Sequence, residues 1–240
     1  MKFALNLPNF GPHADVETLA ELAATAESAG WDGFFLWDHV LSEQPDAPFV
    51  DPWVAMAAIA ISTQRVRLGA MVTPLPRRRP WQVARETVSL DHLSGGRLIF
   101  GAGIGGDGWR EYSAFGEDPD ARRHGAMLDE ALDVLTGLWS GETFSYGGEH
   151  YTIRDARFLP VPVQSPRIPV WVAGLWPNKR PFRRAARWDG VFPIGRDAPL
   201  EPDDVRAMVA YMAEHRAGGG PMDIAVSAPG AIRDRASLTA

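Results

Sequence analysis

The chain has 240 residues and a formal net charge of −6, and 45% of its residues are hydrophobic. This length suits one large α/β domain or two small ones, and the acidic balance argues against a nucleic-acid-binding surface. The sequence contains no cysteine, which excludes disulfides, thiolate zinc sites and cysteine nucleophiles, and it has no run approaching the roughly 20 apolar residues of a membrane span.

Short apolar runs alternate with amphipathic segments along the chain. The runs are bounded by glycine, proline or aspartate, which is typical of buried parallel strands. In chain order, we expect strands at 3–7, 33–37, 68–72, 98–102, 169–173, 190–194 and 223–227. Capping residues and helical spacing predict helices at 16–29, 52–63, 82–93, 126–139, 181–187 and 201–216. Residues 143–163 alternate aromatic and polar groups and predict a small β-hairpin.

The repeated strand–helix pattern predicts one domain over residues 1–240, because no linker divides it. Two α/β architectures fit this pattern, an eight-stranded barrel and an open doubly wound sheet. Only residues 228–240 follow the seventh predicted strand, and they are too few for a further helix, strand and helix. A barrel would therefore lack its last βα unit.

Asp38 and His39 follow the second predicted strand directly. Polar residues at this end of a strand face the mouth of an α/β protein, and histidine is the side chain best suited to moving protons near neutral pH. The alternative is that Asp38 caps a loop and His39 lies on the surface. Their location favours a functional role.

Residues 101–106 formally match the pattern G-x-G-x-x-G. A dinucleotide-binding fingerprint opens directly into a helix and precedes a strand ending in an acid, whereas Asp107-Gly108-Trp109 follows here. We therefore interpret Gly103 and Gly105 as positions where the backbone approaches something flat or bulky, such as a cofactor ring.

Two other stretches could bind anions. Ala173, Gly174 and Leu175 precede a predicted helix with several cations, which suits either a phosphate cradle or an ordinary turn. Residues 77–79 are three consecutive arginines, for which we predict a solvated loop.

Asp91 and His92 lie in the last turn of a predicted helix, where a structural role is expected. His13, Asp38 and His39 form only a loose set of metal ligands, and we predict no metal site.

Several stretches, taken together and in order, resemble the luciferase-like monooxygenase superfamily, which includes coenzyme F420-dependent oxidoreductases. The matching stretches are 27–39, 51–53, 67–80, 90–97, 101–105, 128–132, 138–142, 169–174 and 189–190.

The resemblance implies a (β/α)8 TIM barrel of the bacterial-luciferase-like type, here lacking the last βα unit. It also implies FMN or coenzyme F420 at the C-terminal mouth. The ring would rest on Ala70, Met71 and Val72, with a cis Met71–Val72 peptide. Gly103 and Gly105 would lie beside the cofactor, and its phosphate would sit near residues 173–175.

In F420-dependent members, a histidine matching His39 is the proposed proton donor or acceptor, and Asp38 would contact the ring or orient the loop. The resemblance thus implies an oxidoreductase that acts on a small organic substrate by hydride transfer with F420, or by oxygen insertion with reduced FMN and O2. In the second case four aromatic residues would keep the pocket apolar, namely Trp37, Trp53, Trp109 and Phe115.

Two departures narrow the expected substrate. The glutamate and asparagine that follow strand four in the sugar-phosphate dehydrogenases are absent from residues 105–107, so a sugar phosphate is not expected. The double histidine of true luciferases is also absent, so light emission is not expected.

Two other functions remain open: a non-catalytic barrel that binds a cofactor or a partner, and a metal-dependent hydrolase using His13, Asp38, His39 and Glu111. We expect a cytoplasmic homodimer that binds neither membranes nor nucleic acid, and a separate flavin reductase if the cofactor is FMN.

Overall fold

The computed structural model describes residues 1–196, 198–216 and 220–227. Its parallel strands fall into two sheets. The first has the order β1 (Ala4–Leu7), β2 (Gly33–Leu36), β3 (Arg67–Ala70). The second has the order β10 (Asp223–Ile224), β9 (Gly190–Gly195), β8 (Val170–Trp176), β5 (Phe100–Gly103), β4 (Thr73–Pro74). A parallel bridge between Leu68 and Leu98 joins the two sheets, so the strands follow one another from β1 to β10 in sequence order.

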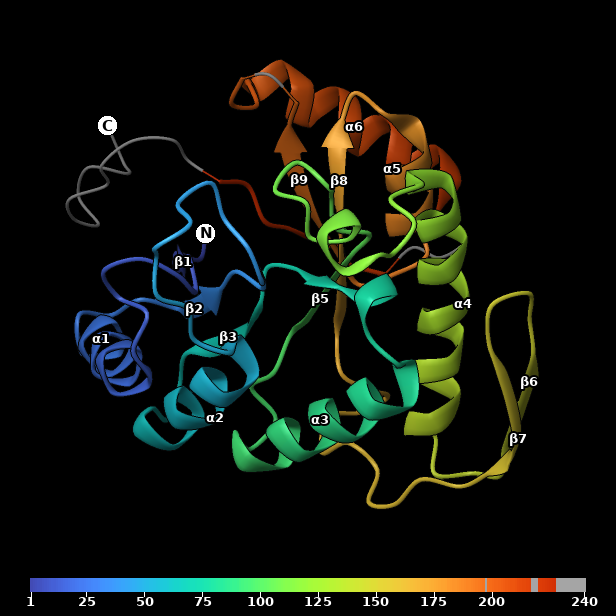
Figure 1. Ribbon diagram of the computed structural model, residues 1–240, viewed down its shortest axis with the longest axis horizontal. Coiled ribbons are helices and arrows are strands. Elements are labelled where there is room, and N and C mark those ends of the chain that lie inside the picture. The colour runs from blue at the N-terminus through green and yellow to red at the C-terminus, as the bar shows by residue number, and fades with distance from the viewer. Residues whose placement is uncertain (197, 217–219, 228–240) are drawn as a thin grey trace.

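The helices form an outer layer around these strands (Figure 1). They are α1 (Val16–Ser28), α2 (Pro52–Ser62), α3 (Pro80–Leu93), α4 (Ala121–Trp139), α5 (Lys179–Ala185) and α6 (Pro202–His215). Sequential strand order without a reversal is that of a (β/α)8 barrel, and it excludes the doubly wound alternative. No strand pairing joins β10 to β1 within the described residues. The residues after 227, on which the missing-unit prediction partly depends, lie outside the described part of the chain.

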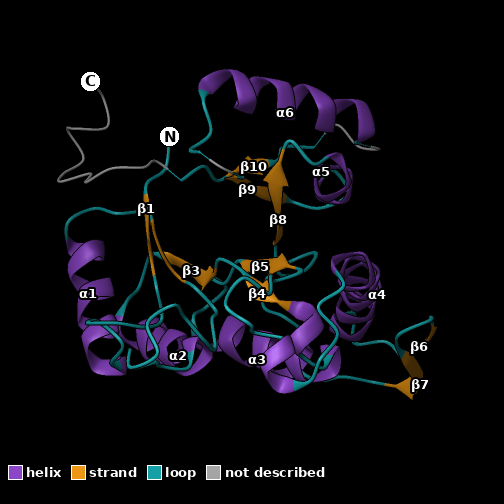
Figure 2. Cartoon of the chain, turned by 45° about the horizontal axis from the view of Figure 1, so that its top comes forward, coloured by secondary structure: helices purple, strands orange, loops and turns teal. Residues whose placement is uncertain are grey.

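The predicted hairpin is present as β6 (Phe144–Gly147) paired antiparallel with β7 (Thr152–Ala156). It projects outward beside one end of α4 (Figure 2). No helix in the described ranges is long and apolar enough to cross a membrane.

The structure differs from the predicted elements at several points. Helix α4 begins at Ala121 instead of 126, because the Asp120 carboxylate accepts hydrogen bonds from the Arg122 and Arg123 amides and caps it. Strand β8 runs on to Trp176, paired with β9 throughout, so residues 173–175 belong to a strand and not to a turn. Two short 3₁₀ helices, η1 (Leu75–Arg77) and η2 (Ser113–Phe115), lie in segments predicted as loops.

Alternation along the strands separates two hydrophobic layers. One layer fills the space between strands and helices and includes Phe34, Leu68 and Val172. The other lies inside the barrel and contains Phe35, Met71, Ile99 and Phe192, with Val72, Trp171, Ala173 and Ala225 packed against it. Because successive strand residues point to opposite faces, neighbours within one strand, such as Phe34 and Phe35, belong to different layers.

Buried charges close the N-terminal end of the barrel. The Arg97 guanidinium donates hydrogen bonds to the carbonyl oxygens of Ala60, Thr63, Val66 and Ser94, at 2.7–3.0 Å. These bonds satisfy carbonyl groups at the end of α2, in the turn that follows it, and at the end of α3.

Glu27 has the complementary role at this end, because its carboxylate accepts from the backbone amides of residues 64–66. Burial on its own raises the pKa of Glu27, but these three amides outweigh burial and hold the pKa below its ordinary value.

Candidate active site

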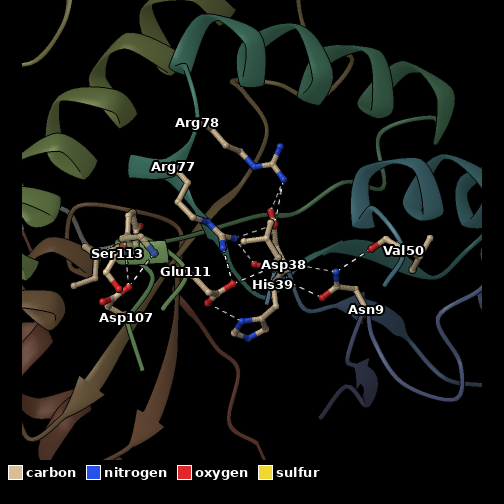
Figure 3. Close-up of polar contacts among 12 residues, drawn as sticks. Asn9, Asp38, His39, Val50, Arg77, Arg78, Asp107, Glu111 and Ser113 are labelled. Atoms are coloured by element: carbon tan, nitrogen blue, oxygen red, sulfur yellow. Dashed lines mark hydrogen bonds and ion pairs between the residues drawn. The ribbon is translucent and has the colours of Figure 1, made fainter. Parts of the chain in front are cut away.

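Three segments bring charged side chains together at the C-terminal end of the strands (Figure 3). Asp38 and His39 follow β2, Arg77 and Arg78 follow β4, and Glu111 lies in the loop after β5. The carboxyl ends of parallel strands meet at one edge, so these segments converge although they lie far apart in the sequence.

Arg77 links the two carboxylates of this cluster. Its Nη1 donates to Glu111 Oε1 at 2.6 Å, and its Nη2 donates to the Asp38 carbonyl oxygen at 2.5 Å and to Asp38 Oδ1 at 3.2 Å. Arg78 Nη2 donates to Asp38 Oδ2 at 2.9 Å. The prediction of a solvated loop was therefore wrong for Arg77 and Arg78, whose side chains are 8% and 23% exposed. Buried carboxylates need such partners, and these arginines supply them.

Glu111 orients the His39 ring. Glu111 Oε2 lies 2.9 Å from His39 Nδ1, and Glu111 Oε1 accepts from the Val40 amide at 2.9 Å. Burial on its own raises the pKa of Glu111, but the bonds from His39 and Val40 and the charge of Arg77 hold it below its ordinary value. A carboxylate can only accept, so the proton of the neutral imidazole resides on Nδ1 and Nε2 carries the free lone pair.

The backbone and ring of His39 are both held in place. Asn9 Oδ1 accepts from the His39 amide at 3.0 Å, and Asn9 Nδ2 donates to the His39 carbonyl oxygen at 2.9 Å. The ring centroid lies 4.5 Å from that of Trp109, 5.7 Å from Trp37 and 6.1 Å from Phe10. The side chain remains 30% exposed, so an oriented, titratable ring remains open to a ligand.

Three predicted cofactor residues converge beside this cluster. A Cβ atom at Gly103 would lie 2.5 Å from Val72 Cγ2 and 3.8 Å from the Ala173 Cβ, so only glycine fits. Beyond them, Leu175 and Ile194 are opposite each other in β8 and β9 and are 43% and 42% exposed. The Met71–Val72 peptide is cis, as predicted.

Other predicted cofactor residues are placed differently. Ala70 is 2% exposed and packs in the layer facing the helices. A Cβ atom at Gly174 would lie 2.5 Å from Pro181 Cβ of α5, so this position also faces outward. Gly105 has φ +69° and turns the chain between Tyr112 and Pro74, which explains this glycine by the protein's own packing. Ala70 and Gly174 could therefore reach a ligand in the mouth only through their backbone.

Of the four aromatic residues expected at the pocket, two contact His39. Trp37 and Trp109 contact the His39 ring, but Trp53 packs against Phe100 in the outer layer, with ring centroids 6.4 Å apart. Phe115 is 61% exposed.

Asp91 has the predicted structural role. It is fully buried, and its carboxylate accepts from the Val163 amide at 2.7 Å and from the Gln164 backbone and side-chain amides at 3.1 and 2.7 Å.

The described residues contain no group of three or more histidine or acidic side chains arranged to hold a metal ion. The carboxylates of Asp38 and Glu111, which the hydrolase alternative requires, are bound by arginines instead.

Sequence reasoning missed Asn9 and the two arginines, and it named Glu111 only as a metal ligand. The sequence nonetheless contained a signal for this ion-pair cluster. Asp38 follows β2 and Glu111 follows β5, whereas Arg77 and Arg78 follow β4, which lies between those two strands in the sequence.

Comparison with known proteins agrees with this fold. The sequence model of the luciferase-like monooxygenase family matches residues 1–238, and the chain belongs to this family. An uncharacterised protein of Mycobacterium tuberculosis is 34% identical, over 85% of this chain and 74% of its own length. The F420-dependent glucose-6-phosphate dehydrogenase of Gordonia bronchialis is 35% identical, over 83% of this chain and 60% of its own length.

Two solved structures share the fold. A monooxygenase from Streptomyces bottropensis is 26% identical, with a TM-score of 0.79 over 93% of this chain and 69% of that chain. An F420-dependent secondary alcohol dehydrogenase, solved with an F420–acetone adduct, is 21% identical and has a TM-score of 0.79. The match covers 93% of this chain and 67% of that chain.

Proposed function

We propose that this chain is an oxidoreductase that uses FMN or coenzyme F420, binds it at the C-terminal mouth of the barrel, and moves a proton through His39 Nε2. The observation that carries the proposal is the contact of His39 Nδ1 with Glu111 at 2.9 Å. This contact fixes the tautomer and leaves Nε2 as the basic nitrogen of a partly exposed ring. Family membership supports the cofactor class.

The residues of the mouth fit a flat, largely apolar ring. Val72, Gly103 and Ala173 form a narrow surface, and Leu175 and Ile194 extend it with exposed apolar side chains. Exposed apolar side chains on neighbouring strand ends are typical of a ligand surface.

A polar group near this surface lacks a partner. The hydroxyl of Thr73, which follows Val72 in the chain, is fully buried and has no hydrogen-bond partner among the described residues. A ring with polar edge atoms would satisfy it only if the residues that cover it moved.

The bound cofactor would supply the donor or acceptor of hydride, and with reduced FMN the electrons for oxygen insertion. The chain's own part is acid–base and steric. His39 would accept or return a proton at Nε2, and Glu111 would stabilise the protonated ring. Trp37 and Trp109 would exclude water from one side of the His39 ring. In this account Asp38 positions Arg77 and Arg78, and a direct contact of Asp38 with the ring remains a prediction.

Cofactor titration tests the proposal directly. FMN and F420, each oxidised and reduced, are added to the full chain while absorbance and fluorescence are followed. We expect one of them to bind with a Kd below about 100 μM, and failure of both would remove the basis of the proposal.

A variant pair locates the cofactor. Leu175→Asp places a charge on the exposed apolar surface and should weaken binding by about tenfold or more. Leu93→Asp is the matched control, because Leu93 is equally exposed (47%) at the end of α3. Equal affinities in both variants would place the cofactor elsewhere.

A second pair tests His39 itself. His39→Ala should bind cofactor and lose about 100-fold or more of turnover, whereas His13→Ala should keep it. The relatives suggest the assays, which are oxidation of glucose 6-phosphate or a secondary alcohol with F420, and oxygenation with reduced FMN and O2. Full turnover by His39→Ala would remove its catalytic role. Binding without turnover in the unchanged chain would favour the non-catalytic alternative.

A homodimer and, with FMN, a separate flavin reductase complete the proposal. Light scattering of the purified chain and reconstitution with an added reductase test these two points.

A further inference from the structure

A second pocket lies behind the arginines of the site, between η1 and the first turns of α4. Its volume is about 310 Å³. Among the residues that line it are Pro76, Arg79, Glu117, Arg123, Met127 and Tyr151. Arg77 and Arg78 also border it, although their guanidinium groups are bound to Asp38 and Glu111. We call this cavity the Tyr151 pocket. Its volume is at the small end of the range for ligand sites.

The hydroxyl of Tyr151 is the first sign of a ligand. Tyr151 is 5% exposed, and its buried hydroxyl has no hydrogen-bond partner in the part of the chain that the structure describes. Burial raises the pKa of this phenol, so it stays protonated and acts as a donor. A buried donor without an acceptor is unfavourable, and most such groups in native proteins are satisfied.

Arg79 is the second sign. Arg77, Arg78 and Arg123 each have a carboxylate partner. For Arg79, no carboxylate among the described residues lies within 4.0 Å. Its guanidinium carbon lies over the Trp81 ring, 5.9 Å from the ring centroid. Its charge acts on the Tyr151 hydroxyl, opposing the effect of burial on the pKa of that group. Arg79, which is exposed to solvent, and the buried Tyr151 both line the same cavity.

The acidic residues of the pocket limit the charge of the ligand. Asp118 is paired with Arg123 at 3.2 Å, but Glu117, which has no ion-pair partner among residues 1–196, 198–216 and 220–227, also lines the cavity. One unpaired cation and one unpaired carboxylate would disfavour a doubly charged phosphate and admit a single negative charge. Pro76 and Met127 provide an apolar wall.

We propose that the Tyr151 pocket binds a small aliphatic carboxylate. Its oxygens accept hydrogen bonds from the Tyr151 hydroxyl and the Arg79 guanidinium, and its alkyl group packs against Met127 and Pro76. This site is separate from the cofactor surface and does not depend on the identity of the cofactor.

Propionate is the probe, titrated at constant ionic strength with chloride as the balancing anion, and followed by the NMR signals of the full chain. We expect saturable shifts around Arg79 and Tyr151 with a Kd of about 1–10 mM, typical of a ligand with few atoms. Arg79→Gln and Tyr151→Phe should each weaken binding by about tenfold, since each removes one donor to a charged group. Arg122→Gln is the matched control, because Arg122 is an exposed arginine in the first turn of α4 and is not among the residues that line the pocket.

Unchanged affinity in either pocket variant, or no saturation up to about 50 mM, overturns the proposal. Inorganic phosphate is titrated in parallel, and tighter binding of phosphate than of propionate overturns the assignment to a carboxylate.

The thermal midpoint without ligand checks that the hydroxyl is truly unpartnered. Removing an unsatisfied buried hydroxyl is neutral or stabilising, so Tyr151→Phe should have an unchanged or higher Tm than the parent. A lower Tm would mean that the protein itself satisfies the hydroxyl, and it would remove the main observation behind the pocket.

Discussion

Charged side chains are buried at both ends of the barrel, but their partners differ. At the N-terminal end, Arg97 and Glu27 are bound mainly by backbone carbonyl and amide groups, whose charge does not change with pH. At the C-terminal end, Asp38, Arg77 and Glu111 are bound by one another and by His39. The first arrangement fixes turns between elements. The second ends in a histidine that remains 30% exposed and keeps one ring nitrogen available.

This difference separates a structural polar cluster from a functional one. A buried charge surrounded by fixed dipoles has nothing to exchange with a ligand. In a connected row of ionisable side chains, a change of charge on one group alters the proton affinity of the next group. Three substitutions test the contrast, from the largest expected effect to the smallest.

Replacing Arg97 should have the largest effect on folding. Arg97→Met leaves the carbonyl oxygens of Ala60, Thr63 and Val66 without their donor, and the loss should be roughly 3 kcal/mol or more of the free energy of unfolding. Urea unfolding measures it, with Arg122→Met as the exposed control. Cofactor affinity below the unfolding transition should stay unchanged. A loss below about 1 kcal/mol would show that this end of the barrel does not depend on the arginine.

Glu111→Gln should have an intermediate effect that depends on pH. The pKa of Glu111 is below its ordinary value of 4.5 in the folded chain, so its carboxylate stabilises the fold above pH 4.5, and this stabilisation is lost as pH falls through the folded pKa. The variant should lose roughly 2 kcal/mol at pH 7 and converge with the parent in acid. Urea midpoints measured from pH 7 downward give the comparison. If the difference in urea midpoint between variant and parent stayed constant over this pH range, the predicted link between Glu111 ionisation and stability would be contradicted.

Arg78→Gln should have the smallest effect. Asp38 keeps its bonds to Arg77 when Arg78 is removed, and the Arg78 side chain is already 23% exposed. We expect a loss below about 1 kcal/mol in urea unfolding. If the loss equalled that of Arg97→Met, the two ends of the barrel would be equally structural and the contrast would fail.

The sequence predicted the strands well because each is a short apolar run with clear breakers at both ends. It also placed Asp38 and His39 correctly, since the end of β2 coincides with the end of the apolar run. The resemblance added the cis Met71–Val72 peptide, which no local pattern indicates.

The errors have two physical causes. The pairing of Arg77 with Glu111 joins segments 34 residues apart, and no local spacing encodes it. Ala70 and Gly174 were grouped with their neighbours, but alternation along a strand turns each of them toward the helices. A range of three residues in a strand cannot face one ligand with all its side chains.

By itself, therefore, the sequence determined the order of elements and the strand end that carries the histidine, because these depend on local hydrophobicity and turn chemistry. The sequence pattern left the barrel and the doubly wound sheet both open, and only the family resemblance favoured the barrel. Only the tertiary structure decided which charges neutralise one another, which face each strand residue presents, and which polar groups are left without partners. Those properties depend on distances between segments remote in sequence. Burial makes them important for stability, because a buried charge or polar group without a partner is costly. The oriented His39 and the unpartnered hydroxyl of Tyr151 both belong to this second class.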